Sequence, residues 1–278
     1  MALIQQNDIP YHLDPSNDPF REFDLYYHSF PVKEVPFPPL ICFVHGGAWR
    51  SEDKCNHSDL ARNLVSQTSF PVVVPNYRLS QKGNGVVHPV HAQDVLQFLH
   101  FITSNNSTLP PVFDPHRIYL IGHSCSAHML ASILLDTSAT TPVLTPSPVL
   151  LDAVQGVILS EGIYDIDLLL NDFPNYRSWF IADAFGDMPS YAAFNVAALS
   201  LRNLNDTKWL IIHSTGDTLV NNSQSQAMLD HLRALYRDTD TSHLVQGNMK
   251  DLNDEHDALL STTTYLHIVK EFIEARVR

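Results

Sequence analysis

The chain has 278 residues, of which 44% are hydrophobic and 17% are charged, so it can bury a substantial core and is neither a disordered nor a coiled-coil protein. Its formal net charge is −13 and its Lys and Arg residues form no cluster, which argues against nucleic-acid binding because phosphate contacts need a basic patch. Three cysteines without regular spacing argue against a disulfide framework or a zinc knuckle.

The N-terminal residues, MALIQQND, lack the basic region and apolar run of a secretory signal peptide. The sequence also has no run of about 18 apolar residues, the length that a transmembrane helix needs. We therefore expect a cytoplasmic protein that makes no contact with a membrane.

Strand-like and helix-like segments alternate along most of the chain. Residues 1–20 are polar and proline-rich and predict an extended arm, and residues 23–30 favour an edge strand. Further strands are expected at 40–44, 70–75, 118–121, 153–159, 208–213 and 242–246. Helices are expected at 58–67, 89–103, 125–135, 223–236 and 259–277. This alternation predicts a single α/β domain, residues 1–278, with a mostly parallel central sheet and helices on both faces.

Two adjacent glycines follow the buried strand 40–44, in the sequence H-G-G-A-W from His45 to Trp49. Glycine permits backbone conformations closed to other residues and lets a ligand approach the main chain. An H-G-G loop in this position supplies oxyanion-hole N–H groups in hydrolases. We predict an oxyanion hole from Gly46, Gly47 and Ala48, together with the N–H of Cys125. The alternative is a tight turn without a catalytic role.

A strand, a sharp turn and a helix are predicted around the sequence I-Y-L-I-G-H-S-C-S-A, residues 118–127. This pattern is typical of the nucleophile elbow of α/β-hydrolases, in which a strained turn projects a serine hydroxyl above the sheet. The serine here is Ser124. Ser126 stands where the usual G-x-S-x-G pattern has its last glycine, and we interpret it as another small residue that the crowded turn tolerates.

Residues 161–200 follow the next predicted strand and are rich in aromatic side chains. These are Tyr164, Phe173, Tyr176, Trp179, Phe180, Phe185, Tyr191 and Phe194. In α/β-hydrolases this position holds a lid or cap insertion that shapes the substrate pocket. We expect a small cap here, with most of the aromatic residues in packing and one or two in the pocket.

Ser124, Asp217 and His256 occur in the chain order of an α/β-hydrolase triad, each after a predicted strand. Histidine is a suitable base at neutral pH for activating serine, and the aspartate orients it and stabilises the imidazolium. The rival bases are His243 and His267, and the rival acids are Asp240, Asp251 and Asp254. The competing chemistry is a metal site at His88, His91 and Asp94, which we disfavour because Pro89 interrupts the spacing.

The H-G-G-A-W sequence, the G-H-S-C elbow and the segment S-E-G-I-Y-D (160–165) together resemble the serine-dependent kynurenine formamidases, or arylformamidases, of the fungal type. The resemblance extends from Leu40 to the end of the chain. It implies hydrolysis of N-formyl-L-kynurenine to L-kynurenine and formate in tryptophan degradation through the kynurenine pathway, with no metal or organic cofactor and a homodimeric assembly. It also places Trp49 in the pocket wall, against the aryl group of the substrate.

Two alternatives to this function remain open. One is a carboxylesterase or amidase that acts on another small aryl ester or amide, including one of secondary metabolism. The other is a catalytically silent α/β-hydrolase fold that serves as a binding protein, against which the intact set of Ser124, Asp217 and His256 argues.

Overall fold

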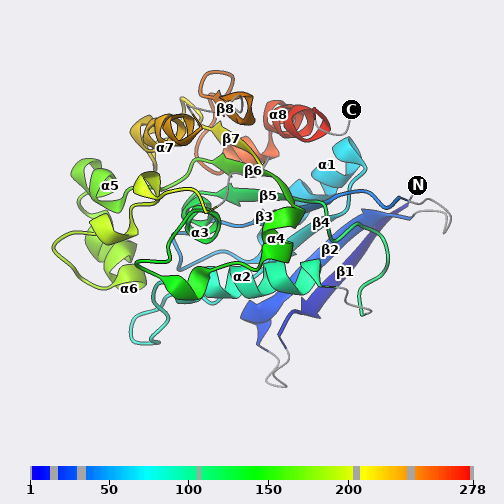
Figure 1. Ribbon diagram of the computed structural model, residues 1–278, viewed down its shortest axis with the longest axis horizontal. Coiled ribbons are helices and arrows are strands. Elements are labelled where there is room, and N and C mark those ends of the chain that lie inside the picture. Colours follow the sequence, from blue (N-terminus) through cyan, green and yellow to red (C-terminus); the bar gives the residue numbers. More distant parts are fainter. Residues whose placement is uncertain are drawn as a thin grey trace.

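One eight-stranded sheet forms the centre of the computed structural model, which describes residues 2–12, 18–29, 36–104, 108–202, 207–236 and 242–275 (Figure 1). Its strands are β1 (Leu3–Pro10), β2 (Glu22–His28), β3 (Leu40–Val44), β4 (Val72–Pro75), β5 (Ile118–His123), β6 (Val154–Ser160), β7 (Lys208–Ile212) and β8 (Val245–Asn248). Their order in the sheet is β1-β2-β4-β3-β5-β6-β7-β8. Strand β2 is antiparallel to its neighbours β1 and β4, and the other pairs are parallel. The predicted α/β-hydrolase fold is confirmed.

Helices cover both faces of this sheet (Figure 1). They are α1 (Ser58–Thr68), α2 (Val90–Thr103), α3 (Cys125–Leu134), α4 (Pro148–Ala153), α5 (Ile166–Asp172), α6 (Ala182–Phe185), α7 (Asn222–Leu235) and α8 (Thr263–Glu274). Among the described residues, no helix combines the length and the apolar character that crossing a bilayer requires.

The strand side chains divide between two apolar layers because successive residues of a strand point to opposite faces. In β3, Ile41 and Phe43 pack with residues of α1 and α8. Leu40, Cys42 and Val44 pack with residues of α2, α3, α4 and α7 on the other face. All five residues of β3 are fully buried, as its continuous apolar sequence predicts.

The N-terminal region differs from the sequence-based expectation. Residues 3–10 form strand β1, which pairs with β2 through its backbone, so the prediction of a free extended arm is wrong. Because β1 takes the edge of the sheet, β2 lies inside it rather than at the edge. Most β1 side chains are exposed or half-buried, and a strand held mainly by backbone pairing has no clear hydrophobic pattern to recognise.

The C-terminal boundaries also shift, because short 3-10 turns precede two elements. Residues Ser242–Leu244 form such a turn, so β8 begins at Val245. A second turn spans Ala258–Ser261, and the side chain of Thr262 then caps α8 by accepting the N–H of Tyr265 at 3.2 Å. The last helix therefore starts at Thr263 rather than at residue 259.

The carboxyl ends of the parallel strands carry the predicted site residues. Strand β3 leads into the glycine loop, β5 ends at the turn of Ser124, and Asp217 follows β7. Residues 161–200, which we call the cap segment, include α5, α6 and the π-helical turn Arg177–Ile181, and α5 and α6 lie at the left of Figure 1. Function in open α/β sheets concentrates at this end of the strands.

Candidate active site

Ser124 sits at the turn between β5 and α3 with a strained backbone, φ 58° and ψ −123°. A side chain at Gly122 would meet Leu130 Cδ1 at 2.9 Å and the backbone N of Ala127 at 3.0 Å, so strand and helix pack closely here. The N–H of Ser124 donates to the carbonyl of Ser160 at 2.9 Å. This conformation is that of a nucleophile elbow, and Ser124 lines a cavity.

Ser126 gives the elbow a tie to the neighbouring strand. It is fully buried, and its hydroxyl donates to the carbonyl of Val44 at the end of β3, at 2.6 Å. The same hydroxyl accepts the N–H of His123 at 2.7 Å. Serine at this position therefore links the elbow to the strand that carries the glycine loop, which a glycine could not do.

Replacing Ser126 by alanine or by glycine is expected to lower the free energy of unfolding by about 1–3 kcal/mol, because the buried N–H of His123 and the carbonyl of Val44 lose their partner. Urea unfolding measures this. Ser132→Ala is the matched control in the same helix, because the buried hydroxyl of Ser132 donates only within α3, to the carbonyl of His128. Equal losses in the two alanine variants would contradict the proposed tie.

Asp217 and His256 form a hydrogen-bonded pair, with His256 Nδ1 and Asp217 Oδ2 2.7 Å apart. Both side chains are buried, at 0% exposure for Asp217 and 7% for His256. Asp217 Oδ1 accepts the N–H groups of Leu219 at 2.8 Å and Val220 at 3.0 Å. Burial alone would raise the pKa of Asp217, but the hydrogen bonds from His256 and Glu161 hold it well below its usual range.

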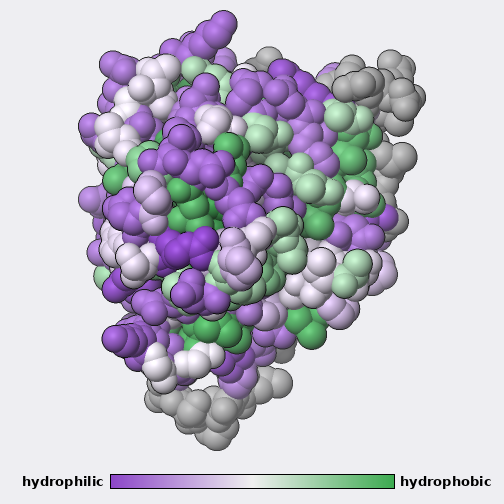
Figure 2. All heavy atoms as spheres, turned by 90° about the vertical axis from the view of Figure 1, so that its left-hand side faces the viewer, coloured by the Kyte–Doolittle hydropathy of each residue, from purple (hydrophilic) through white to green (hydrophobic). Residues whose placement is uncertain are grey.

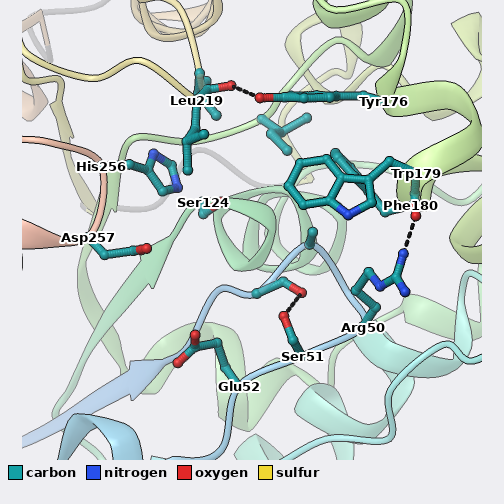
Figure 3. Close-up of a pocket in the computed structure, with 14 residues that line it drawn as sticks. Arg50, Ser51, Glu52, Ser124, Tyr176, Trp179, Phe180, Leu219, His256 and Asp257 are labelled. Carbon is teal, nitrogen blue, oxygen red and sulfur yellow. Dashed lines mark hydrogen bonds between the residues drawn. The ribbon is translucent and has the colours of Figure 1, made fainter.

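The ring of His256 points into the cavity beside Ser124 (Figure 3). His123 lies against it, with ring centroids 4.7 Å apart, and its Nε2 is 3.1 Å from Asp257 Oδ1. Burial lowers the pKa of His123 to about 4, so this neighbour is uncharged at neutral pH. The structure thus places Ser124 and His256 in the lining of one cavity and pairs His256 with Asp217.

The glycine loop carries three consecutive residues with positive φ: Gly47 at 90°, Ala48 at 53° and Trp49 at 59°. Such strain in residues other than glycine persists only where the surroundings fix it, and it is concentrated at functional sites. The hydroxyl of Tyr77 donates to the carbonyl of Gly46 at 2.6 Å, below the loop. Gly47 and Ala48 line the cavity with Ser124, whereas Gly46 is buried behind them.

Cys125, the other residue predicted to serve the oxyanion hole, is fully buried directly after Ser124. Its sulfur accepts the N–H of Trp49 at 3.2 Å. Burial raises the pKa of the Cys125 thiol to about 12, so the thiol stays protonated and serves as packing between the elbow and the glycine loop.

The cavity has a volume of about 270 Å³ and two unlike walls. Its apolar wall consists of Ile163, Tyr176, Trp179, Phe180, Leu219 and Val220, from the cap segment and the loop after β7. Arg50, Ser51, Glu52 and Asp257 contribute polar groups on the opposite side (Figure 3). On the face that carries α5 and α6, Figure 2 shows apolar residues set within a mostly hydrophilic surface. From the sequence, one or two aromatic residues of 161–200 are expected in the pocket without saying which, and the structure places Tyr176, Trp179 and Phe180 there. The remaining residues of the two walls carry no sequence signal that predicts them.

Trp49 does not lie in the pocket wall, where the resemblance to the kynurenine formamidases places it. Its side chain is fully buried and packs edge-on against Phe185, with ring centroids 5.0 Å apart, and it does not line the cavity. The positive φ of the loop directs the side chain into the core. The cavity's aromatic wall instead includes Tyr176 and Trp179, of which Trp179 is 48% exposed.

Those rival bases and acids that the structure describes do not line the cavity. His267 lies in α8, is 66% exposed and pairs with Glu271 at 3.2 Å. His243 is in the turn before β8, and Asp251 is exposed and accepts from Asn248. Asp254 is half-buried and does not line the cavity, and Asp240 lies outside the described residues.

Potential metal-ligating atoms gather in two places among the described residues, and both include His256. The groups are His123, His256 and Asp257, and Glu161, Asp217 and His256. Their atoms take part in the hydrogen bonds of the site, which favours a proton-transfer network. Two of the residues considered as metal ligands from the sequence have other partners. His91 bonds Ser80 at 2.8 Å, and both carboxylate oxygens of Asp94 accept from Arg78.

The BD-FAE family model matches residues 23–232. A kynurenine formamidase of Meyerozyma guilliermondii is 27% identical over 70% of this chain and 71% of its own. An isoprenylcysteine alpha-carbonyl methylesterase of Arabidopsis thaliana is 28% identical over 62% of this chain and 39% of its own.

Solved esterase structures share the fold. Esterase B from Lactobacillus rhamnosis, inhibited by a C6-C4 SN3 compound, superimposes with a TM-score of 0.69 at 20% identity, over 98% of this chain and 87% of the other. A truncated carbohydrate esterase from gut microbiota gives a TM-score of 0.72 at 18% identity, over 98% of this chain and 95% of the other.

Proposed function

Since this chain belongs to the BD-FAE family of α/β hydrolases, we propose that it is an arylformamidase, which hydrolyses N-formyl-L-kynurenine to L-kynurenine and formate. The general class, a serine hydrolase, agrees with its formamidase and esterase relatives. The narrower substrate rests on one observation. The cavity beside Ser124 pairs an aromatic wall with a charged wall, and the proposed substrate pairs an aryl group with an amino acid.

In the proposed mechanism, Ser124 attacks the formyl carbon while His256 takes the hydroxyl proton. Asp217, held 2.7 Å from His256 Nδ1, stabilises the imidazolium that forms. The oxygen of the tetrahedral intermediate receives backbone N–H groups from Gly47, Ala48 and Cys125.

His256 then gives its proton to the leaving aryl nitrogen, the C–N bond breaks, and L-kynurenine departs from a formyl-serine. Water, activated by His256, attacks this ester, and formate leaves as Ser124 regains its proton. No group beyond the substrate, water and these side chains is required for the balance of atoms.

The two walls suggest how the substrate would lie. Its aryl ring would rest against Tyr176, Trp179 and Phe180, since flat aromatic surfaces pack offset or edge-to-face. Its carboxylate would face the guanidinium of Arg50, which the carbonyl of Trp179 holds at the mouth of the cavity. Its ammonium would face Glu52 and Asp257.

Turnover of N-formyl-L-kynurenine beside a neutral short-chain aryl ester tests this assignment, with Ser124→Ala as the control for the nucleophile. We expect Ser124-dependent hydrolysis of the formamide with a kcat/KM well above that of the ester. Hydrolysis of the ester alone would instead make the protein a general carboxylesterase. Failure to turn over either compound, with Ser124 inert to a fluorophosphonate, would leave a binding protein.

Arg50→Ala sharpens the same test. We expect KM for N-formyl-L-kynurenine to rise about 10- to 100-fold, as for the loss of a hydrogen bond to a charged group, while the neutral ester is hardly affected. Arg62→Ala is the matched control, because Arg62 lies on α1, pairs with Asp59 and does not line the cavity. Equal effects of Arg50→Ala on the two substrates would contradict carboxylate recognition.

A further inference from the structure

We infer that Glu161 is a positioning residue whose carboxyl group keeps its proton and donates it to Asp217, so that Asp217 is fixed as the ionised partner of His256. The inference rests on the proposed serine-hydrolase mechanism, but it does not depend on which formamide or ester is the substrate. Glu161 follows β6 directly, one strand away from Asp217 in the sheet.

Three groups meet at this point of the structure. Glu161, Asp217 and His256 each place one oxygen or nitrogen atom within 4.8 Å of those of the other two. Glu161 and the side chain of Asp217 are both 0% exposed. Two adjacent carboxylates cannot both remain ionised without water, because like charges at this separation repel strongly in a buried site.

The hydrogen bonds decide which of the two carries the proton. Asp217 receives the N–H groups of Leu219 and Val220 and the Nδ1 of His256, all of which favour its charged form. Glu161 receives a single N–H, from Ser214 to Oε1 at 2.6 Å. Its Oε2 accepts no N–H within the described part of the chain, and it is therefore the oxygen on which a proton can reside.

Among the described residues, the basic groups beside Glu161 are His256, which pairs with Asp217, and His213. His213 Nδ1 lies 3.1 Å from Oε2, but it is also 3.0 Å from the hydroxyl of Ser225, and burial lowers the pKa of His213. Tyr164 and Tyr265 also lie nearby and are buried phenols whose pKa values burial raises. Burial and the neighbouring Asp217 raise the pKa of Glu161 to about 10, which agrees with a proton retained at neutral pH.

The backbone of Glu161 is held in a strained conformation that aims its side chain at Asp217. Its φ is +51°, in the left-handed region that a glutamate rarely adopts, and its N–H donates to the carbonyl of Ile212 at 3.1 Å. The residues on either side hold the nucleophile: Ser160 accepts the N–H of Ser124, and Ile163 donates to its carbonyl at 3.3 Å. This short segment thus contacts the nucleophile and the acid of the same site.

Two substitutions with side chains of nearly the same size test whether Glu161 acts as a hydrogen-bond donor to Asp217 or only fills space. Glu161→Gln keeps a neutral group that donates to Asp217 and accepts from Ser214, whereas Glu161→Met keeps only the length of the side chain. With the aryl ester as substrate, we expect Glu161→Gln to retain kcat within about threefold. We expect Glu161→Met to lose about 10- to 100-fold in kcat with little change in KM.

The pH dependence of kcat and the infrared spectrum test the protonation of Glu161 directly, because a change in packing alone would alter neither. The kcat of the wild type should fall as the pH approaches about 10, where Glu161 ionises beside Asp217, and Glu161→Gln should lack that fall. At pH 8 the folded wild type should show the C=O stretch of one protonated carboxyl group, absent from Glu161→Gln. This band needs no turnover, so it tests Glu161 even if the proposed substrate is wrong.

Three outcomes would overturn the inference: an equal loss in Glu161→Gln and Glu161→Met, wild-type rates in both, or no protonated carboxyl band at pH 8. Failure of the proposed function would appear differently, as a wild type that is inactive on the formamide while the infrared band is present.

Discussion

Replacing His256 by alanine is expected to lower kcat by about 10⁴- to 10⁶-fold, because the proposed nucleophile loses its general base and the leaving group its acid. Asp217→Asn should cost about 10⁴-fold, since an amide disrupts the Nδ1 hydrogen bond that sets the tautomer of His256. Initial rates on the aryl ester measure both, with circular dichroism to confirm folding.

His267→Ala is the control for this experiment, because His267 is exposed and lies on the surface of α8. Its rate should equal that of the wild type. A loss of less than about tenfold in His256→Ala would refute the assignment of His256 as the base, whatever the substrate.

Gly47→Ala should lower kcat by about 10²- to 10³-fold, the scale of a lost oxyanion donor. A Cβ at Gly47 would lie 2.2 Å from the carbonyl oxygen of Ser51 and 2.6 Å from Glu52 Cγ, so the loop must move. The carbonyl of Gly47 accepts the N–H groups of Arg50 at 3.0 Å and Ser51 at 2.9 Å, so this shift displaces the whole turn.

Gly83→Ala separates backbone strain from the clash. Gly83 has a φ of +80°, close to the +90° of Gly47, but a Cβ there would meet nothing within 4 Å. Both variants suffer the left-handed strain, which costs about 1–2 kcal/mol, whereas only Gly47→Ala should lose kcat. If the two variants keep the same kcat, the glycine loop does not serve the oxyanion.

The sequence predicts the strands well where burial on both faces requires a continuous run of apolar residues. The run from Leu40 to Val44 is apolar because both of its faces are covered, and the structure places β3 at those residues. Strand β1 has no such pattern, because it is held through the backbone of β2 and all of its residues are exposed or only half-buried. Helix α4 is also missed, since its six residues follow a proline-rich loop and show less than two turns of periodicity.

Site residues are predictable when their place in the fold reveals them. Ser124, Asp217 and His256 each follow a strand, and the structure brings them to one end of the sheet. Glu161 also follows a buried strand directly, but an acid in that position does not reveal its role without knowing what its side chain contacts. The direction of Trp49 depends on backbone dihedrals, and the cavity wall formed by Tyr176 and Trp179 depends on how the cap segment folds back.

The location of the three tryptophans has an optical consequence. Trp49 and Trp209 are enclosed in the core, at 0% and 2% exposure, whereas Trp179 stands half-exposed in the cavity wall. We expect the emission of the two enclosed tryptophans to change little when a ligand enters, and that of Trp179 to respond when water beside its ring is displaced. The native protein therefore carries its own fluorescent reporter of ligand occupancy, which titrations can use without a label and without turnover.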